Sequence, residues 1–102
     1  MAKVTINEEV ARGWLADVAQ DKLFWCQDGR AMKNLGELAT ALREMSEETY
    51  SYHAKEGKND FSNWVRDVIG DVTLARQLQK AATQATAARK VETRLGQLRA
   101  KV

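Results

Sequence analysis

Residues 34–45, NLGELATALREM, decide the class of this fold. Asn34 and Glu37 have the spacing of a capping box, in which one side chain caps the first helical turn and the other reaches back to it. Behind this cap the apolar residues recur at helical spacing, at Leu35, Leu38, Ala39, Leu42 and Met45. Because such a stripe buries one face of a helix, the stretch predicts an amphipathic helix.

A β-hairpin is predicted immediately before this helix, near residues 23–33. The apolar run at 23–26 stops at Asp28 and Gly29, and an apolar run that ends in Asp-Gly is typical of a strand followed by a turn. Residues 31–33 supply a short returning strand. Since an isolated hairpin is only marginally stable in water, this one has to pack on helices.

Further helices are predicted on both sides. Asn7 caps an N-terminal helix, and a second short helix begins at Ser46. Asp60 is expected to cap a helix that ends at Gly70, with its inward positions at Phe61, Trp64, Val65, Val68 and Ile69. Asp71 restarts the chain as one long helix that is predicted to continue to about residue 101.

The composition sets the broad class. The chain has 102 residues, 44% of them hydrophobic and 29% charged, with a net charge of +2, which fits one domain and excludes a disordered tail. There is no proline, which disfavours an all-β fold with many tight turns. No stretch of 18 apolar residues and no apolar signal-peptide core occur, and the single cysteine, Cys26, has no partner for an internal disulfide. We expect a cytoplasmic, mainly α (α+β) compact helical domain with a short hairpin and a long C-terminal helix.

Charge divides the chain into two parts. Residues 1–79 hold ten Lys and Arg against thirteen Asp and Glu, and this part is expected to be the compact domain. Residues 80–102 are expected to be a basic helical extension, with Glu92 as their only acidic residue and cations at Lys80, Arg89, Lys90, Arg94, Arg99 and Lys101. The six cations form a solvated helix face, or they contact nucleic acid or another anionic partner.

The last predicted helix carries a nearly heptad apolar seam. Its large members are Leu74, Leu78, Val91, Leu95 and Leu98, and alanines fill the middle. Since an alanine-rich helix of this length is only marginally stable alone, it needs a partner. The seam predicts a homo-oligomer or a protein partner that docks on this helix.

One group of polar and aromatic residues could form a network: Tyr52, His53, Asp60, Asn63 and Trp64. His53 could act as a general acid or base oriented by Asp60, or it could tie one helix to the start of the next by a structural hydrogen bond. The structural role is the favoured interpretation. With one histidine and no Cys-x-x-Cys pair, neither a metal site nor another cofactor is expected.

Cysteine and tryptophan are two further residue types that could serve chemistry or binding. Cys26 lies in an aromatic run, where a buried inert thiol is the usual outcome. No phosphate-binding loop or hydrolase motif occurs, so an enzyme is not expected. The tryptophans Trp14, Trp25 and Trp64 are expected in the core, and one that proved exposed beside Tyr50 or Tyr52 would be a candidate binding anchor.

A resemblance covers about half of the chain. The pattern comprises Trp25, Asp28 and Gly29, then Leu35 and Leu38, then Tyr52-His53 with residues 60–71 (DFSNWVRDVIGD), and finally Leu74-Ala75. On these residues the segment 24–75 resembles a small prokaryotic domain family, archaeal and bacterial, of unknown function. The resemblance implies a compact, mainly helical fold and carries no activity.

The sequence therefore predicts a non-catalytic interaction or regulatory module that self-associates or binds a protein through its C-terminal helix. The first alternative is a small nucleic-acid-binding protein that uses the basic tail. The second is a small-ligand or enzymatic site around His53 and Asp60.

Overall fold

The computed structural model describes residues 6–55 and 57–102. In these residues the α-helices are α1 (Glu8–Leu15), α2 (Leu35–Glu44), α3 (Glu47–His53), α4 (Asp60–Trp64), α5 (Val72–Lys80) and α6 (Gln84–Arg99). A 3₁₀ turn occupies Gln20–Lys22, and a π-helical turn at Val65–Ile69 continues α4. Two small antiparallel hairpins pair β1 (Phe24–Trp25) with β2 (Ala31–Met32) and β3 (Ala54–Lys55) with β4 (Lys58–Asn59). The predicted mainly helical fold with a short hairpin near 23–33 is confirmed.

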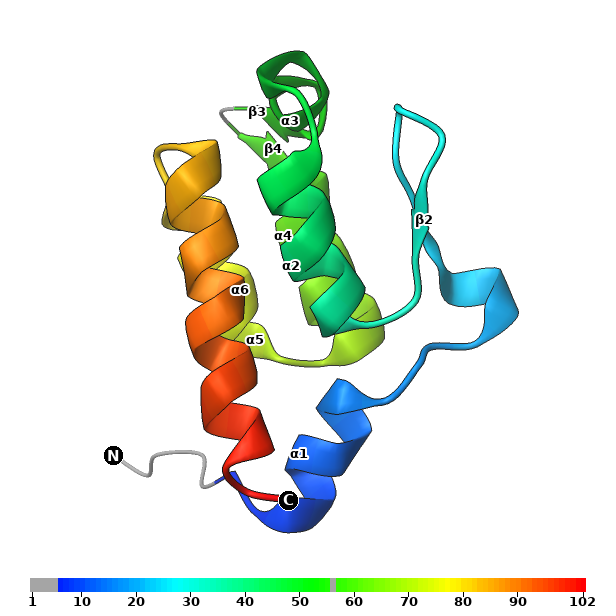
Figure 1. The fold of residues 1–102 in the computed structure, drawn as a ribbon, viewed down its shortest axis with the longest axis vertical. Helices are drawn as coiled ribbons and strands as arrows, with labels where there is room; N and C mark the ends of the chain where they lie inside the picture. The colour runs from blue at the N-terminus through cyan, green and yellow to red at the C-terminus, as the bar shows by residue number, and fades with distance from the viewer. Residues whose placement is uncertain (1–5, 56) are drawn as a thin grey trace.

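Helix α2 packs lengthwise against α6, and the two run in opposite directions (Figure 1). The predicted cap is present, because the Asn34 side chain accepts from the Glu37 N–H at 2.8 Å. The fully buried side chains at this contact are Leu35, Leu38 and Leu42 of α2 with Val91 and Leu98 of α6. The Gln84 amide donates to the carbonyl oxygens of Leu42 at 2.8 Å and Met45 at 2.7 Å. It thereby satisfies carbonyls that the end of α2 would otherwise leave without partners.

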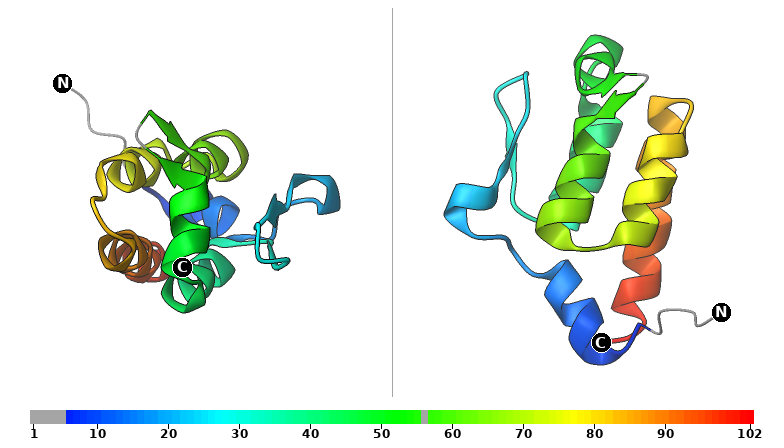
Figure 2. Two further views of the ribbon diagram at one scale, coloured as in Figure 1. Left: turned by 90° about the horizontal axis from the view of Figure 1, so that it is seen from above. Right: turned by 180° about the vertical axis from the view of Figure 1, so that it is seen from behind.

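The long C-terminal helix is interrupted, so the prediction of one continuous helix from 72 to 101 is wrong. Helix α5 ends at Lys80, and Thr83 caps α6 by accepting from the Thr86 N–H at 3.1 Å. Helix α6 then folds back on α5 (Figure 2). One straight helix would leave its apolar side in water, whereas the turn at 81–83 lets both segments bury theirs in one core. Residues 80–102 are therefore part of the compact domain and not an extension of it.

The five residues of the predicted oligomer seam are buried in this core. Leu74, Leu78, Val91, Leu95 and Leu98 are between 0% and 4% exposed within a single chain. The prediction that these five residues meet a second copy is wrong, because α4 and α6 pack on α5, and α1, α2 and α5 pack on α6. The apolar periodicity marks residues that are buried, and the surfaces that cover them belong to the same chain.

A buried ion pair joins the start of α5 to the C-terminal half of α6. Arg94 donates from Nε to Asp71 Oδ2 at 2.6 Å and from Nη2 to Asp71 Oδ1 at 2.8 Å. Asp71 is fully buried and also caps α5 by accepting from the Leu74 N–H at 3.1 Å. The Arg94 guanidinium lies 5.5 Å from the centre of the Trp14 ring, so α1 joins the same contact. The prediction that Arg94 contacts nucleic acid is therefore wrong, because its charge is turned inward and paired.

Gly70 ends the helical segment before this pair, as predicted. Its φ of 99° lies in the left-handed region that favours glycine, and its N–H donates to the Val65 carbonyl at 2.8 Å. A Cβ at this position would lie 3.3 Å from Trp14 Nε1. Two constraints therefore require glycine here. Among the described residues no helix is long and apolar enough to cross a membrane.

Candidate functional site

His53 is a structural bridge between α3, α4 and the first hairpin. Its ring is 6% exposed, Nδ1 lies 3.0 Å from Asp60 Oδ2, and Nε2 accepts from the Gln27 N–H at 2.9 Å. Because Nε2 is an acceptor here, the bonding pattern assigns the ring proton to Nδ1. Both nitrogens are thus occupied by partners within the protein. The sequence left open whether His53 and Asp60 are in contact, and the structure brings them together.

The residue that caps α4 differs from the one predicted. Asn59 accepts from the Ser62 N–H at 3.0 Å, and Asp60 is the first helical residue. Since Asn59 serves the cap, the Asp60 carboxylate is free to bind His53. Sequence reasoning placed the cap one residue too late because Asn and Asp are both good capping residues.

An aromatic cluster holds the base of the hairpin on this bridge. The Phe24 ring lies 5.1 Å from His53, 5.1 Å from Phe61 and 6.0 Å from Trp64, measured between ring centroids. Trp64 is buried and donates from Nε1 to the Lys22 carbonyl at 2.8 Å. Trp64 is therefore a core residue, as predicted, and it ties α4 to the chain just before β1.

The other two members of the predicted network lie at the surface. Tyr52 is 54% exposed, with its ring edge-on to His53 at 4.9 Å. Asn63 is exposed on α4. The structure thus brings Tyr52, His53 and Asp60 together and leaves Asn63 outside.

Cys26 lies in the turn of the hairpin and is buried. Burial raises the pKa of its thiol, which keeps the sulfur protonated and weakly nucleophilic at neutral pH. Its N–H donates to the Arg30 carbonyl at 2.9 Å, so its backbone serves the hairpin. In the same turn the Arg30 N–H donates to Asp28, and this bond lowers the pKa of the Asp28 carboxyl.

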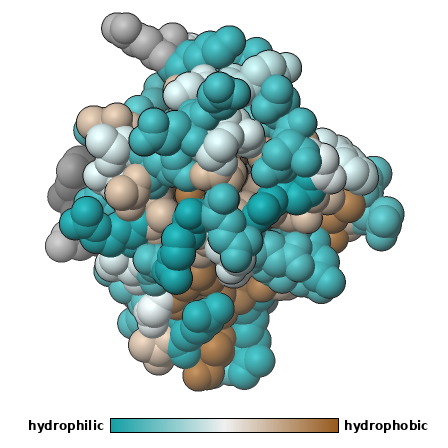
Figure 3. Space-filling view, turned by 45° about the horizontal axis from the view of Figure 1, so that its top comes forward, coloured by the Kyte–Doolittle hydropathy of each residue, from teal (hydrophilic) through white to brown (hydrophobic). Residues whose placement is uncertain are grey.

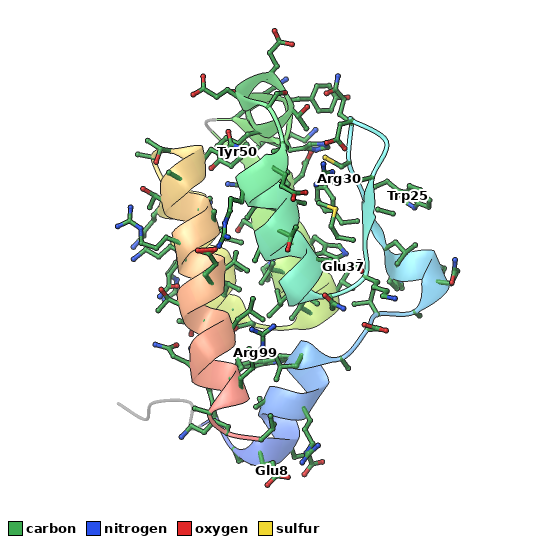
Figure 4. The ribbon with its side chains drawn as sticks, viewed as in Figure 1. Glu8, Trp25, Arg30, Glu37, Tyr50 and Arg99 are labelled. Atoms are coloured by element: carbon green, nitrogen blue, oxygen red, sulfur yellow. The ribbon has the colours of Figure 1, made fainter. Side chains whose placement is uncertain are left out.

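Trp25 is the most exposed large apolar residue in the described part of the chain. Its side chain is 69% exposed and points away from the helices (Figure 4). Successive residues of a strand face opposite sides, so Trp25 turns outward because its neighbour Phe24 packs inward. The expectation that Trp25 lies in the core is wrong. Its cross-strand partner is Ala31, and we call this side of β1–β2, Trp25 with Ala31, the hairpin face.

The hairpin face is held in a fixed position. On its inner side Phe24 and Met32 are 7% and 1% exposed. The Val18 N–H donates to the Lys33 carbonyl at 2.7 Å, and Arg30 contacts both Asp28 and Glu44 at 3.2 Å. The surface view is mostly hydrophilic, with small hydrophobic areas at the lower centre and at the right edge (Figure 3). Trp25 is therefore presented on a rigid support and not on a loose loop.

A groove of about 630 Å³ separates the hairpin from α2. It is lined by Arg30, Ala31 and Met32 of the hairpin, by Asn34, Gly36, Glu37, Thr40 and Ala41, and by Arg99 of α6. Figure 4 shows Arg30 and Glu37 between the hairpin and α2, with Arg99 below them. Because Arg30 is matched by two carboxylates and Glu37 lines the same space, the groove carries mixed charge and no concentrated site for an anion.

The remaining predicted cations lie at the surface. Lys80, Arg89, Lys90, Arg99 and Lys101 are exposed, in contrast to Arg94. The residues that the structure describes contain no group of three His, Cys, Asp or Glu side chains placed to hold a metal ion.

Two features of the site were missed by sequence reasoning. The Asp71–Arg94 pair was missed because its members are 23 residues apart and no spacing rule connects them. The outward position of Trp25 was missed because Phe24 and Trp25 are both aromatic, and the sequence does not say which of them is buried.

The fold and site define a small helical domain that carries one exposed tryptophan on a fixed hairpin. Residues 17–99 match the model of the Family of unknown function (DUF5752), and the chain belongs to this family. The match extends beyond residues 24–75, which carried the resemblance, and includes α6. No curated protein and no solved structure matches the chain.

Proposed function

We propose that this chain is a non-catalytic interaction module that binds a protein partner through the hairpin face, with Trp25 as the anchor. The observation that carries the proposal is the 69% exposure of a tryptophan on a rigid support. Tryptophan is enriched among the residues that dominate protein interfaces, because burying its large ring excludes much apolar surface from water. Since the hairpin is already fixed, binding costs little conformational entropy.

The groups that could perform chemistry support a role without catalysis. A general base needs a free nitrogen within reach of a substrate proton, and both nitrogens of His53 are bound to Asp60 and Gln27. A nucleophilic cysteine needs a lowered pKa, and burial raises the pKa of Cys26. The alternative of a ligand or enzymatic site around His53 and Asp60 is accordingly the weaker one, and no cofactor is proposed.

The proposed contact surface differs from the C-terminal helix seam. Helix α6 buries its apolar side against α2, so this side has nothing left to offer a partner. The hairpin face is the exposed apolar surface that remains beside the groove. We also propose that the protein is cytoplasmic, and its single free cysteine supports a reducing compartment. We further propose that its family is prokaryotic and that the Tyr52–Asp71 pattern is the family's sequence signature.

The test compares three tagged chains produced in cells of the source organism: wild type, Trp25→Ala and Val72→Ala. Val72 is a matched control, because it is 52% exposed and lies on α5, outside the hairpin. We expect proteins that the wild type and Val72→Ala retain and that Trp25→Ala loses. With one such protein purified, Trp25→Ala should raise the dissociation constant by about 30-fold or more, the equivalent of roughly 2 kcal/mol for a central anchor.

The proposal is wrong if the wild type retains nothing beyond what Trp25→Ala retains. It is also wrong if the purified partner binds both chains with the same affinity. Circular dichroism of Trp25→Ala should show an unchanged helical signal, because the side chain that is removed contributes little to the core.

A further inference from the structure

A second surface, formed by residues 72–102, plays no part in the proposed function and is rich in positive charge. Residues 72–102 contain seven Lys and Arg and a single acidic residue, Glu92. The rest of the chain has the opposite balance, with nine Lys and Arg against thirteen Asp and Glu. The helical hairpin of α5 and α6 is thus strongly basic on a domain whose other elements are acidic.

The structure shows which of these charges are available. Arg94 forms an ion pair with Asp71 inside the core, and Glu92 is paired with Arg43 of α2. The six cations that remain are all exposed: Arg76, Lys80, Arg89, Lys90, Arg99 and Lys101. Within residues 6–55 and 57–102 none of the six takes part in an ion pair. An ion pair within the protein therefore accounts for the charge of Arg94 but not for the charges of the other six cations.

Their placement follows the two helices. Arg76 and Lys80 are one turn apart on α5, and Arg89 and Lys90 lie on the exposed side of α6. Helix α6 has 16 residues and is about 24 Å long, a length comparable with seven base pairs of duplex. The exposed residues between its cations are small or polar, such as Thr93, Gly96 and Gln97, and they leave the cations accessible. Figure 1 shows α6 on the opposite side of the molecule from the first hairpin.

We propose that the outer surface of α5 and α6 binds the phosphate backbone of nucleic acid without reading its sequence. Charge complementarity is the reason, because the exposed cations Arg76, Lys80, Arg89 and Lys90 give this surface a positive charge that suits a phosphate backbone. Arg99 lies apart from these four, since it lines the groove between the first hairpin and α2. A protein partner is the weaker fit, since residues 72–102 contain no aromatic side chain and their exposed large apolar side chains, Val72 and Val102, lie at the two ends of the segment. This surface is separate from the hairpin face, so both can be occupied at once.

The expected binding is weak and strongly dependent on salt. If about three phosphates are neutralised, the slope of log K against log salt is about −2.7. Raising sodium chloride from 50 to 200 mM should then weaken binding by about 40-fold. We expect a dissociation constant in the micromolar range at the lower salt concentration.

The experiment measures fluorescence anisotropy of a labelled 24-base-pair duplex with the full chain and two double variants. The test variant is Arg89→Gln/Lys90→Gln. The matched control is Arg12→Gln/Arg66→Gln, which removes two exposed positive charges outside α5 and α6 that are paired with Glu8 and Asp67. Both variants change the net charge equally, so a difference between them reports position and not total charge. Circular dichroism confirms that each keeps its helical content.

The proposal expects binding at 50 mM salt that the control retains and the test variant loses by at least about tenfold, with a shallower salt slope. It is overturned if the duplex does not bind at 50 mM salt, or if the two variants weaken binding equally. It is also overturned if poly-glutamate of matched charge competes as strongly as unlabelled duplex, because the surface would then serve an acidic protein. Trp25→Ala should leave duplex binding unchanged, which separates this outcome from that of the proposed function.

Discussion

The buried pair of Asp71 and Arg94 allows a quantitative prediction of stability. Either single replacement leaves a charge buried without its partner. Asp71→Ser keeps a side chain that can cap α5 but leaves Arg94 without its ion-pair partner. Arg94→Leu leaves the fully buried carboxylate of Asp71 without its partner. Breaking a buried pair from one side costs about 3–5 kcal/mol. We expect Asp71→Ser near the lower end, because Arg94 is 9% exposed and can reach Gln97 or water, and Arg94→Leu near the upper end.

The double variant Asp71→Ser/Arg94→Leu should be far more stable than the sum of the single losses. Replacing both members removes the unpaired charge, and such replacements are often close to neutral. The loss of the Arg94 contact with the Trp14 ring leaves a residual cost of about 1 kcal/mol. The coupling between the two positions is then about 5 kcal/mol or more, which is large beside a total stability of roughly 5–15 kcal/mol for a chain of this length.

Urea unfolding followed by circular dichroism measures this cycle. For an m-value of about 1.3 kcal/mol/M, a loss of 4 kcal/mol lowers the midpoint by about 3 M. Arg12→Leu is the control, because Arg12 is paired with Glu8 at the surface and should cost no more than about 1 kcal/mol. The reasoning is refuted if the two single losses add within about 0.5 kcal/mol in the double variant, or if Arg94→Leu unfolds at the wild-type midpoint.

Three further predictions concern glycine, the core and the thiol. Gly70→Ala should lower the free energy of unfolding by about 1–3 kcal/mol in thermal melts, since φ is 99° and the new Cβ approaches Trp14, whereas Gly13→Ala in α1 should be neutral or stabilising; equal melting temperatures would argue against this. Leu98→Ala should cost about 2–5 kcal/mol because Leu98 is fully buried, and light scattering should show the same molar mass for this variant and the wild type; a lower mass for the variant would restore the oligomer seam. Cys26 should react with a thiol reagent at pH 7.5 much more slowly in the folded chain than in urea, and fast labelling of the folded chain would contradict its burial. Because its folded pKa is raised, the stability linked to this thiol is fully present below the ordinary thiol pKa of about 8.5 and is lost as the pH rises toward the folded pKa, which urea midpoints of the wild type and Cys26→Ala at pH 7 and pH 10 would show.

Local features of the fold could be predicted because their causes are local. Asn7, Asn34 and Ser46 cap their helices by accepting from an N–H three residues ahead, as their positions in the sequence indicate. The hairpin near residues 23–33 follows from a strand-forming run that ends in Asp-Gly. The left-handed Gly70 at the end of its helix was also predicted, because the end of a helix depends on the residues beside it. The contact between His53 and Asp60 was left open by the sequence and is decided by the structure.

The sequence by itself determined which residues are apolar, where α1, α2 and α3 begin and where the first hairpin turns. Only the tertiary structure decided what covers each apolar face. A periodic stripe requires a partner surface but does not name it, so the seam of residues 74–98 fits a second chain as well as the core that α5 and α6 share with α2. In the same way, alternation along β1 requires Phe24 and Trp25 to face opposite sides, and the contact of Phe24 with His53 and Phe61 turns Trp25 outward. The fate of Arg94 depends on a carboxylate 23 residues away, and such a pairing exists only after α6 has folded back along α5.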